Sequence, residues 1–322
     1  MSRVLVTGAA GFLGSHLAEA LIARGDEVVG LDNFDSFYPR AVKEANLAAL
    51  RRAGRFRLVE GDIRDRDAVR ALVTADTLVV HLAARAGVRP SLADPELYVS
   101  VNVAGTATLL EACRSAGARG FVFAGSSSVY GDDAPAPFRE DHAAVRPISP
   151  YAATKRAAEL LVSTYAHLFG LRAMSLRFFT AYGPRQRPDL AIHAFTRLIA
   201  EGRTVPMFGD GSTERDYTWV DDIVQGVVAA CDWARGDGAA FEIVNLGESR
   251  TTRLDRLIAM IAEAVGRPAV IERRPSQPGD VRRTCADITR ARDLLGYRPT
   301  TSVEDGIPRF VRWYEETHGR QA

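Results

Sequence analysis

Tyr151 and Lys155 are the pair whose types and spacing first suggest chemistry in this chain of 322 residues. Pro150 favours a helix start, so we expect a helix over residues 151–167 that carries both side chains on one face. An ammonium beside a phenol favours the phenolate, which would lower the pKa of Tyr151 from its usual value of about 10. Tyr151 is therefore a candidate general base near neutral pH. Alone, the pair also fits a solvated helix surface, so the surrounding elements must decide.

A glycine-rich turn lies near the start of the sequence. Residues 3–7 are predicted to form a buried strand, and Gly8, Gly11 and Gly14 follow with GxxGxxG spacing before an apolar-periodic helix to about Arg24. Glycines let the backbone approach a pyrophosphate, and a helix N-terminus offers it amide groups and a positive dipole. A tight structural turn could carry the same glycines, so the motif needs support from its neighbours.

That support comes from Asp32, at the end of the next predicted strand, residues 27–31. An acidic side chain at this position can bind the adenosine ribose hydroxyls and repel a 2′-phosphate. The turn and the acid together predict a bound dinucleotide, NAD in preference to NADP.

Strands and helices then alternate along the chain. Further strands are expected at residues 56–60, 77–81, 121–124, 173–177 and 241–246, and helices at 41–52, 65–73, 95–116 and 220–234. Such alternation predicts an α/β fold of the Rossmann type, a doubly wound parallel sheet that binds ligands at the carboxyl ends of its strands. Asp62, Ala83 and the serines at 126–128 all fall at such ends.

The alternation weakens after residue 177, which indicates a smaller C-terminal α/β substrate lobe. Its expected helices lie near residues 254–265, 288–295 and 303–317. We expect an NAD-binding domain of residues 1–177 and 219–247, and a substrate-binding domain of residues 178–218 and 248–322. A substrate would lie in the cleft between the two lobes.

Composition argues against several other functions. The formal net charge is +1 and charged residues make up 25% of the chain, so nothing favours nucleic acid or a membrane as a partner. Cys113, Cys231 and Cys285 lie far apart, and neither His81 nor His193 has a partner spaced for a metal. His81 is more consistent with a strand-end residue that lines the cofactor cleft. Without an evident signal peptide, we expect a cytoplasmic protein with no bound metal.

With these residues in place, the pattern resembles the extended short-chain dehydrogenase/reductase family of nucleotide-sugar enzymes. The matching motifs occur in the family's order across nearly the whole chain. They are the three glycines, Asp32, Asp62-Ile63, residues 81–84 (His-Leu-Ala-Ala), Asn102, residues 126–131 (Ser-Ser-Ser-Val-Tyr-Gly), Tyr151 with Lys155, Arg215-Asp216-Tyr217 and Asp221-Asp222.

Short stretches indicate the branch of this family. Dehydratases resemble one another in a Thr-Asp-Glu before Val-Tyr-Gly, and decarboxylases of nucleotide-linked uronic acids carry a Glu there. This chain has Ser127 and Ser128 instead, so it looks like a 4-epimerase. Arg185 and Gln186 replace a Trp-Gly that is common in UDP-glucuronate 4-epimerases. Three other stretches resemble those enzymes: residues 125–130, 178–184 and 187–191.

The resemblance implies a reaction and catalytic roles. Tyr151 would take the proton of the sugar C4 hydroxyl while the C4 hydride moves to NAD, and Lys155 would hold the phenolate charge. Ser126 would hydrogen-bond the same hydroxyl. The 4-keto sugar would then turn and be reduced on its other face, which converts UDP-glucuronate to UDP-galacturonate.

The resemblance also implies binding residues. For NAD they are Gly8, Gly11, Phe12, Leu13, Gly14, Asp32, Asn33, Asp62, Ile63, Leu82, Ala83, Ala84, Asn102, Tyr151, Lys155 and Phe178. For the substrate they are Ser126, Ser127, Ser128, Tyr151, Thr180, Arg187, Arg215, Gln277, Asp280 and Arg282. Ordinary surface positions are the alternative for Arg187, Arg215 and the loop at 277–282.

Other functions stay open at this point. A 4-epimerase for UDP-glucose or UDP-N-acetylglucosamine is the nearest rival, because Thr284 leaves room for a carboxylate or for an N-acetyl group. The absent Glu disfavours a decarboxylase. A non-catalytic NAD-binding regulator is disfavoured because Tyr151 and Lys155 are both intact. The family usually forms homodimers, here through the helices expected at 95–116 and 151–167.

Overall fold

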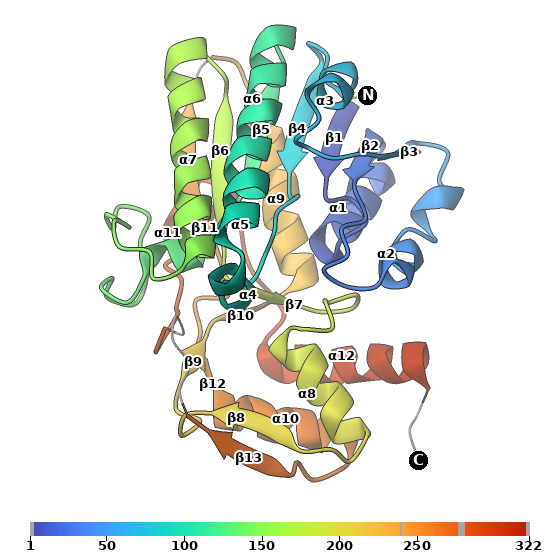
Figure 1. Cartoon of the computed structure of the whole chain (residues 1–322), viewed down its shortest axis with the longest axis vertical. Helices are drawn as coiled ribbons and strands as arrows, with labels where there is room; N and C mark the ends of the chain where they lie inside the picture. The colour runs from blue at the N-terminus through green and yellow to red at the C-terminus, as the bar shows by residue number, and fades with distance from the viewer. Residues whose placement is uncertain (1–2, 239, 276–280, 320–322) are drawn as a thin grey trace.

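The computed structural model describes residues 3–238, 240–275 and 281–319, and its largest unit is a seven-stranded sheet (Figure 1). All strands pair in parallel, in the order β11-β6-β5-β4-β1-β2-β3. This order confirms the predicted doubly wound α/β fold. The strands are β1 (Arg3–Thr7), β2 (Glu27–Asp32), β3 (Phe56–Glu60), β4 (Thr77–His81), β5 (Gly120–Ser126), β6 (Ala173–Phe178) and β11 (Phe241–Leu246).

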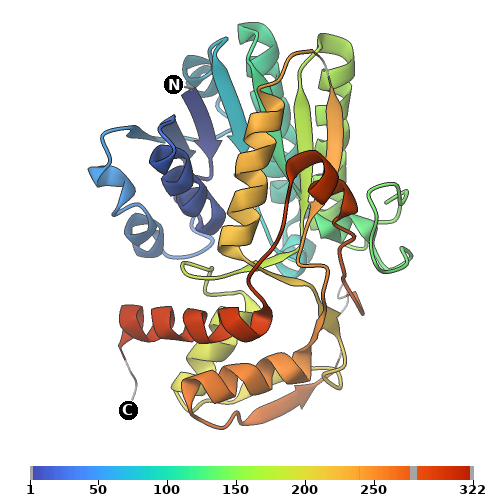
Figure 2. The same ribbon diagram turned by 180° about the vertical axis from the view of Figure 1, so that it is seen from behind.

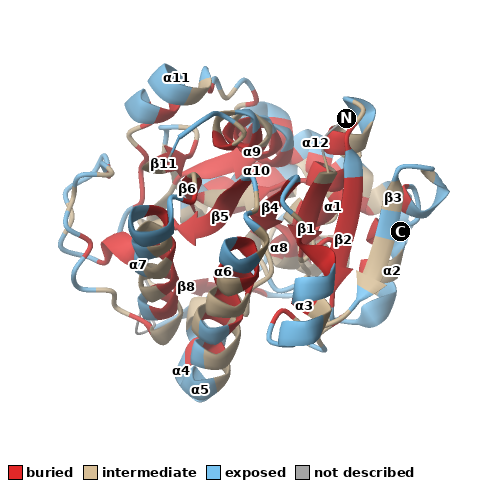
Figure 3. Ribbon diagram, turned by 90° about the horizontal axis from the view of Figure 1, so that it is seen from above, coloured by how far each residue is buried: buried red, intermediate tan, exposed pale blue. Residues whose placement is uncertain are grey.

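Helices cover both faces of this sheet, as Figure 3 shows. On β1, Val4 and Val6 enter one core and Leu5 enters the other, because successive side chains of a strand point to opposite faces. Strands that are buried on both faces must be apolar throughout, which is why they were easy to recognise in the sequence. One face carries α1 (Phe12–Ala23) and α9 (Val220–Ala234), and the other carries α3 (Arg66–Leu72), α6 (Gly105–Ala116) and α7 (Pro150–Phe169).

Two expected helices are shorter or more broken than predicted. The helix expected at 95–116 consists of α5 (Pro95–Tyr98), a π-helical segment (Val99–Ala104) and α6. The helix expected at 41–52 is α2 (Arg40–Asn46) with a separate 3₁₀ turn (Leu50–Arg52), because Leu47 and Leu50 enter the core beside α1. A short helix, α4 (Val88–Ala93), was not predicted.

The smaller lobe is built from strands that pair only two at a time. They are β7 (Thr180–Tyr182) with β10 (Tyr217–Trp219), β9 (Glu214–Arg215) with β12 (Thr252–Arg253), and β8 (Val205–Phe208) with β13 (Ile271–Arg274). Figure 2 shows α10 and α12 below α9 in this part of the molecule. The helices here are α8 (Ala191–Ala200), α10 (Leu254–Val265) and α12 (Val303–His318).

The division of the chain into two domains stays a prediction. The segment assigned to the substrate domain contains α11 (Thr289–Leu295), which packs against α9 and β11 of the large sheet. None of the helices in the described residues combines the length and the apolarity that crossing a membrane requires.

Candidate active site

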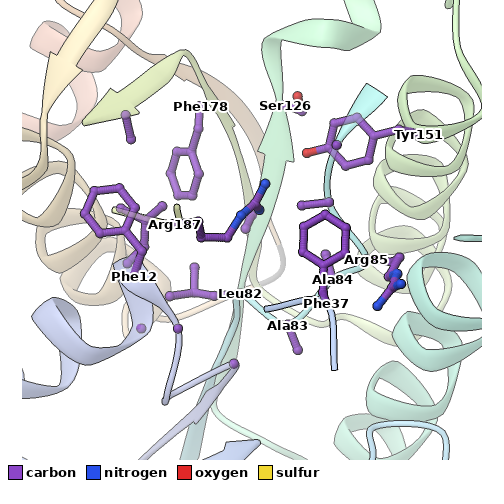
Figure 4. A pocket seen from close by; sticks show the side chains of 18 of the residues that line it. Phe12, Phe37, Leu82, Ala83, Ala84, Arg85, Ser126, Tyr151, Phe178 and Arg187 are labelled. Carbon is purple, nitrogen blue, oxygen red and sulfur yellow. The ribbon is translucent and has the colours of Figure 1, made fainter. Parts of the chain in front are cut away.

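A cavity of about 510 Å³ opens at the carboxyl ends of the parallel strands (Figure 4). Its walls come from the glycine turn, the ends of β2 to β6, the first turns of α7, and β7 with the loop after it. Arg215 and Thr284 complete it from the smaller lobe. The topology therefore brings together residues that are up to 276 positions apart, from Gly8 to Thr284.

The glycine turn is sterically obligatory. Gly8 has a φ of +71°, and a Cβ added to Gly14 would lie 2.1 Å from the carbonyl oxygen of Gly8. Gly11 precedes the first residue of α1 and has no side chain, so it leaves the first amides of that helix uncapped. Gly8, Gly11 and Gly14 all line the cavity. A narrow turn that presents free helix amides fits the pyrophosphate of a dinucleotide.

Asp32 is fixed beside this turn. Its carboxylate accepts hydrogen bonds from the amides of Ala10 (3.0 Å) and Phe34 (2.8 Å). Lys43 lies 3.9 Å from the same carboxylate and donates to the Asp35 carbonyl at 2.8 Å. Burial lowers the pKa of Lys43, and the charges of Asp32 and Asp35 oppose that change. The sequence did not single out Lys43, whose only signal was its place on a helix close to the acid.

A second carboxylate, Asp62, lies beside Asn33, the residue after Asp32. Asp62 accepts hydrogen bonds from Asn33 (2.9 Å) and from Arg64 (2.7 Å), and Asp62 and Asn33 both line the cavity. The hydrogen bond with Arg64 is the main reason that the pKa of Asp62 falls to about 2. Asp62 is therefore ionised at neutral pH and is available as an acceptor for a ribose or a base.

Tyr151 and Lys155 enter the cavity from the first turns of α7, whose start is capped by Ser149 through the amide of Ala152. Lys155 is buried, donates to the Ala124 carbonyl at 2.8 Å, and has its pKa lowered to about 7 by burial. The shared helix face is as expected.

The expected lowering of the Tyr151 pKa by Lys155 is wrong for this structure. Burial is the largest influence and raises the pKa of Tyr151. A hydrogen bond with Ser126 and the positive charge of Arg187 oppose the rise. Tyr98, which the sequence did not indicate, packs edge-on against the Tyr151 ring at a centroid distance of 6.3 Å.

Short hydroxyl side chains line the cavity at the end of β5, in the turn that follows it, and on β7. Ser126, Ser127, Ser128 and Thr180 all line the cavity. The Ser126 and Ser128 hydroxyls lie 2.8 Å apart, and the Ser128 amide donates to the Ser126 hydroxyl at 3.2 Å, which holds the run in a tight turn. Thr180 is placed by its amide, which donates to the Asp216 carbonyl at 3.1 Å.

Arg187 points into the cavity and does not occupy the surface position that was its alternative (Figure 4). Its side chain is 17% exposed and forms paired hydrogen bonds with Asp189 at 2.8 and 3.0 Å. The Phe37 ring lies between two guanidinium groups, 5.1 Å from that of Arg187 and 4.7 Å from that of Arg85. Phe37 and Arg85 line the same cavity and were not found from the sequence.

Two expected site residues are placed elsewhere. The described residues that line the cavity include neither Asn102 nor Arg282. The Asn102 amide is buried and bonded to the backbone of Arg85 and to the Thr154 hydroxyl, so it holds a cavity loop from behind. Arg282 is exposed, and its carbonyl accepts from the Glu214 amide at 3.0 Å.

The remaining predicted residues differ in how the structure places them. Gln277 and Asp280 lie outside the described residues, so their predicted roles stay predictions. His81 does not belong to the described cavity lining, because its ring is buried between the hydroxyls of Thr7 (2.8 Å) and Thr106 (3.0 Å). Among the described residues, no group of three or more His, Cys, Asp or Glu side chains is placed to hold a metal. The other predicted cofactor residues line the cavity: Phe12, Leu13, Ile63, Leu82, Ala83, Ala84 and Phe178.

Comparisons with known proteins agree with this geometry. The family model described as GDP-mannose 4,6 dehydratase matches residues 5–310. The chain is 43% identical to UDP-glucuronate 4-epimerase 4 of Arabidopsis thaliana, over 97% of this chain and 75% of that protein. It is 39% identical to a UDP-glucuronate 4-epimerase of Thermodesulfobacterium geofontis, over 98% and 97% of the two chains.

Solved structures of nucleotide-sugar 4-epimerases also resemble this chain. The UDP-glucuronic acid 4-epimerase of Bacillus cereus in complex with UDP-glucuronic acid and NAD superposes with a TM-score of 0.91 at 36% identity, over 98% of this chain and 100% of that chain. A UDP-glucose 4-epimerase of Thermotoga maritima with UDP-glucose has a TM-score of 0.88 at 31% identity, over 98% and 99% of the chains.

Proposed function

This chain belongs to the extended short-chain dehydrogenase/reductase family, in its nucleotide-sugar 4-epimerase branch, and we propose that it interconverts UDP-glucuronate and UDP-galacturonate with NAD as cofactor. One observation carries the choice of substrate. A largely buried arginine and a run of short hydroxyls, Arg187 with Ser126 to Ser128 and Thr180, share one cavity with Tyr151. Such a set matches a sugar that has both a C4 hydroxyl and a carboxylate.

The cofactor would lie against the glycine turn, Asp32 and Asp62, with Lys155 at its nicotinamide end. The chemistry that bound NAD would supply is reversible hydride transfer at the sugar C4. The Asp32 carboxylate is held by the amides of Ala10 and Phe34 and would repel a 2′-phosphate, which supports NAD over NADP.

Tyr151 is the proposed general base for the C4 hydroxyl. Burial raises its pKa, so the phenolate needs positive charge and hydrogen-bond donors nearby. Arg187 and Ser126 both oppose that rise, and each therefore favours the ionised form that accepts the proton. Ser126 would also hydrogen-bond the hydroxyl as it loses its proton. The buried ammonium of Lys155 is fixed by the Ala124 carbonyl and would hold the cofactor ribose.

The sugar carboxylate is the proposed ligand of Arg187, Ser127, Ser128 and Thr180. A 4-keto glucuronate is a β-keto acid, and it loses CO₂ most easily when the bond to the carboxylate stands perpendicular to the carbonyl plane. Hydroxyl donors and a guanidinium that grip the carboxylate away from that orientation would protect it. Arg187 would exchange its present partner, Asp189, for the substrate.

Arg215 is the proposed cation for the diphosphate. It lines the cavity from the smaller lobe and donates to the Glu214 carbonyl at 2.9 Å, which orients its guanidinium. Gln277, Asp280 and Arg282 remain proposed contacts of the nucleotide.

A second candidate substrate is UDP-N-acetylglucosamine. Thr284 lines the cavity as a small side chain, and its hydroxyl is occupied by the Asp216 amide at 3.2 Å. That wall leaves space for an N-acetyl group as well as for a carboxylate. The position of Arg187 favours the charged sugar.

Assembly and location are also proposals. We propose a homodimer through α6 and α7, because Leu160, Leu168 and Phe169 on α7 are 50, 62 and 49% exposed, a large apolar surface for one helix. Cytoplasmic location is supported by Cys113, Cys231 and Cys285, which are all buried free thiols.

Product analysis tests the proposed reaction. Purified protein would be incubated with UDP-glucuronate, UDP-glucose and UDP-N-acetylglucosamine in separate samples, with and without added NAD⁺, and proton NMR would follow the sugar signals. We expect UDP-galacturonate from the first substrate and slower or no conversion of the neutral sugars. Turnover of the neutral sugars alone would contradict the role given to Arg187 and the hydroxyls.

A further inference from the structure

Asp216 is a fully buried carboxylate that lies outside the cavity, directly after Arg215. One carboxylate oxygen accepts from the Glu248 amide (2.8 Å) and the Thr218 hydroxyl (3.2 Å). The other accepts from the amides of Ser249 (3.0 Å) and Ala286 (2.9 Å). A buried charge is tolerated only with such compensation.

The backbone of the same residue contacts two residues of the cavity wall. Its carbonyl accepts from the Thr180 amide at 3.1 Å, and its amide donates to the Thr284 hydroxyl at 3.2 Å. Thr180, Thr284 and the adjacent Arg215 all line the cavity. A single buried residue thus joins three pieces of the sugar-nucleotide wall that come from distant parts of the chain.

The surrounding secondary structure is too short to do this alone. β9 has two residues, and β7 and β10 have three each. Among the described residues, the segment that contains Thr284 and Ala286 pairs with its neighbours through isolated bridges and not through a strand. Backbone approach is close, since a Cβ on Gly247 would lie 3.0 Å from the Asp216 carboxylate and 2.6 Å from Ala286. The carboxylate bonds to backbone amides of two separate segments, and it thereby fixes their relative positions as the ladder of a longer sheet would.

We propose that Asp216 is a positioning residue for the nucleotide sugar, which sets the relative placement of Thr180, Arg215 and Thr284 without touching the substrate. This inference rests on the proposed function of the cavity. It assigns Asp216 to affinity for the UDP-sugar, and it assigns no part in cofactor binding or in proton transfer. Tyr151, Lys155 and Ser126 are held by α7 and β5, which the Asp216 carboxylate does not contact among the described bonds.

Asp216→Asn is the sharpest test, because it keeps the shape but, in either orientation of the side chain, turns an –NH₂ group toward at least one backbone N–H that the carboxylate accepts from. Asp222→Asn is the matched control. Asp222 is also buried and accepts from the amides of Thr300 (2.9 Å) and Thr301 (3.1 Å), but that segment does not belong to the described cavity lining. Both variants should lose thermal stability.

Only Asp216→Asn should raise KM for UDP-glucuronate, by about tenfold or more, with kcat and the NAD dissociation constant changed by less than about threefold. The dissociation constant of UDP itself, measured by calorimetry, should weaken in parallel. An unchanged KM and UDP affinity in Asp216→Asn, or an equal rise in both variants, would overturn the proposal.

Two further arrangements keep the test decisive. If Asp216→Asn does not fold, Thr218→Val removes a single donor to the carboxylate and should raise KM by about two- to fivefold; no rise would count against the proposal. If the wild type converts another UDP-sugar, the proposed function fails, while UDP affinity in the variants still tests Asp216.

Discussion

The two halves of the cavity are positioned in different ways. The cofactor half consists of strand ends and the turns that follow them, so Gly8, Asp32 and Asp62 are each placed by the strand directly before them. The sugar half consists of Thr180, Arg187, Arg215 and Thr284, which lie on short strands and loops of the smaller lobe. Local structure suffices for the first half, whereas the second depends on long-range contacts such as those of Asp216.

Carboxylates in or near the two halves differ in the direction of their pKa shifts. In the cofactor half, the hydrogen bond with Arg64 lowers the pKa of Asp62 to about 2. Behind the sugar half, burial raises the pKa of Asp216 to about 6 and that of Glu248 to about 7. Asp62 thus presents an ionised group to a ligand, whereas the buried Asp216 carboxylate holds together the loops behind the sugar half.

The largest effect is expected from Tyr151, where the two halves meet. Tyr151→Phe removes the proposed base and should lower kcat by about a thousandfold, with the fold and NAD affinity retained. Tyr98→Phe is the control, because this neighbouring ring donates only to the Ala86 carbonyl at 2.8 Å among the described bonds. Its kcat should stay within about threefold of the wild type. A Tyr151→Phe enzyme with a tenth of normal turnover would contradict the assignment.

The second-largest effect is expected from the two arginines that flank Phe37, because we assign Arg187 to the sugar and Arg85 to the cofactor. Arg187→Met should raise KM for UDP-glucuronate by about 10- to 100-fold, because a charged hydrogen-bond donor to the carboxylate is lost. Arg85 also contacts this ring but pairs with Asp35, close after β2, so Arg85→Met should leave that KM within about threefold and weaken NAD binding instead. Steady-state kinetics and NAD titration of both variants measure the difference. Equal rises in KM would remove the distinction between the halves.

A smaller effect is expected in the cofactor half. Asp32→Asn should weaken NAD binding by about tenfold and reduce the preference for NAD over NADP, with KM for UDP-glucuronate unchanged. Asp26→Asn is the control, since Asp26 is also buried but pairs with Arg24 and Arg235 away from the cavity. It should alter stability alone. Cofactor titration of the apo proteins distinguishes the two, and equal NAD affinities would refute the role of Asp32.

The smallest effect concerns pH and the sugar half. Because the folded-state pKa of Glu248 is raised to about 7, its contribution to stability is present at acidic pH and is lost as pH rises through about 7. Glu248→Gln should therefore gain stability relative to the wild type between pH 5 and pH 8, by about 1 kcal/mol after allowance for solvent screening. Urea unfolding at both pH values measures this. A constant difference would show that Glu248 titrates normally.

The sequence predicted the strands and the glycine turn that carry the cofactor half, because their signals are local. Apolar strands buried on both faces, the glycine spacing and an acid at a strand end each depend on a few adjacent residues. The sugar half was harder, since β7, β9 and β10 are too short to show a period of two. Lys43, Phe37 and Arg85 have no motif of their own and enter the cavity only through tertiary packing.

The Tyr151 pKa shows a different limit. Spacing on a helix correctly indicated that Tyr151 and Lys155 share a face, but it carried no information on burial. Burial of both side chains is the dominant influence, and the charge that favours the Tyr151 phenolate belongs to Arg187. A residue 36 positions later in the chain could not be identified as that charge without the fold.

The most direct test of the whole account follows the hydrogen at C4. Purified protein would receive UDP-glucuronate carrying deuterium at C4, and the product would be examined by NMR and mass spectrometry. If the two halves hold one cofactor against one sugar, the hydrogen removed from C4 returns to it, so UDP-galacturonate should keep its deuterium. Product with hydrogen from solvent at C4, or a pentose formed by loss of CO₂, would contradict the proposed reaction.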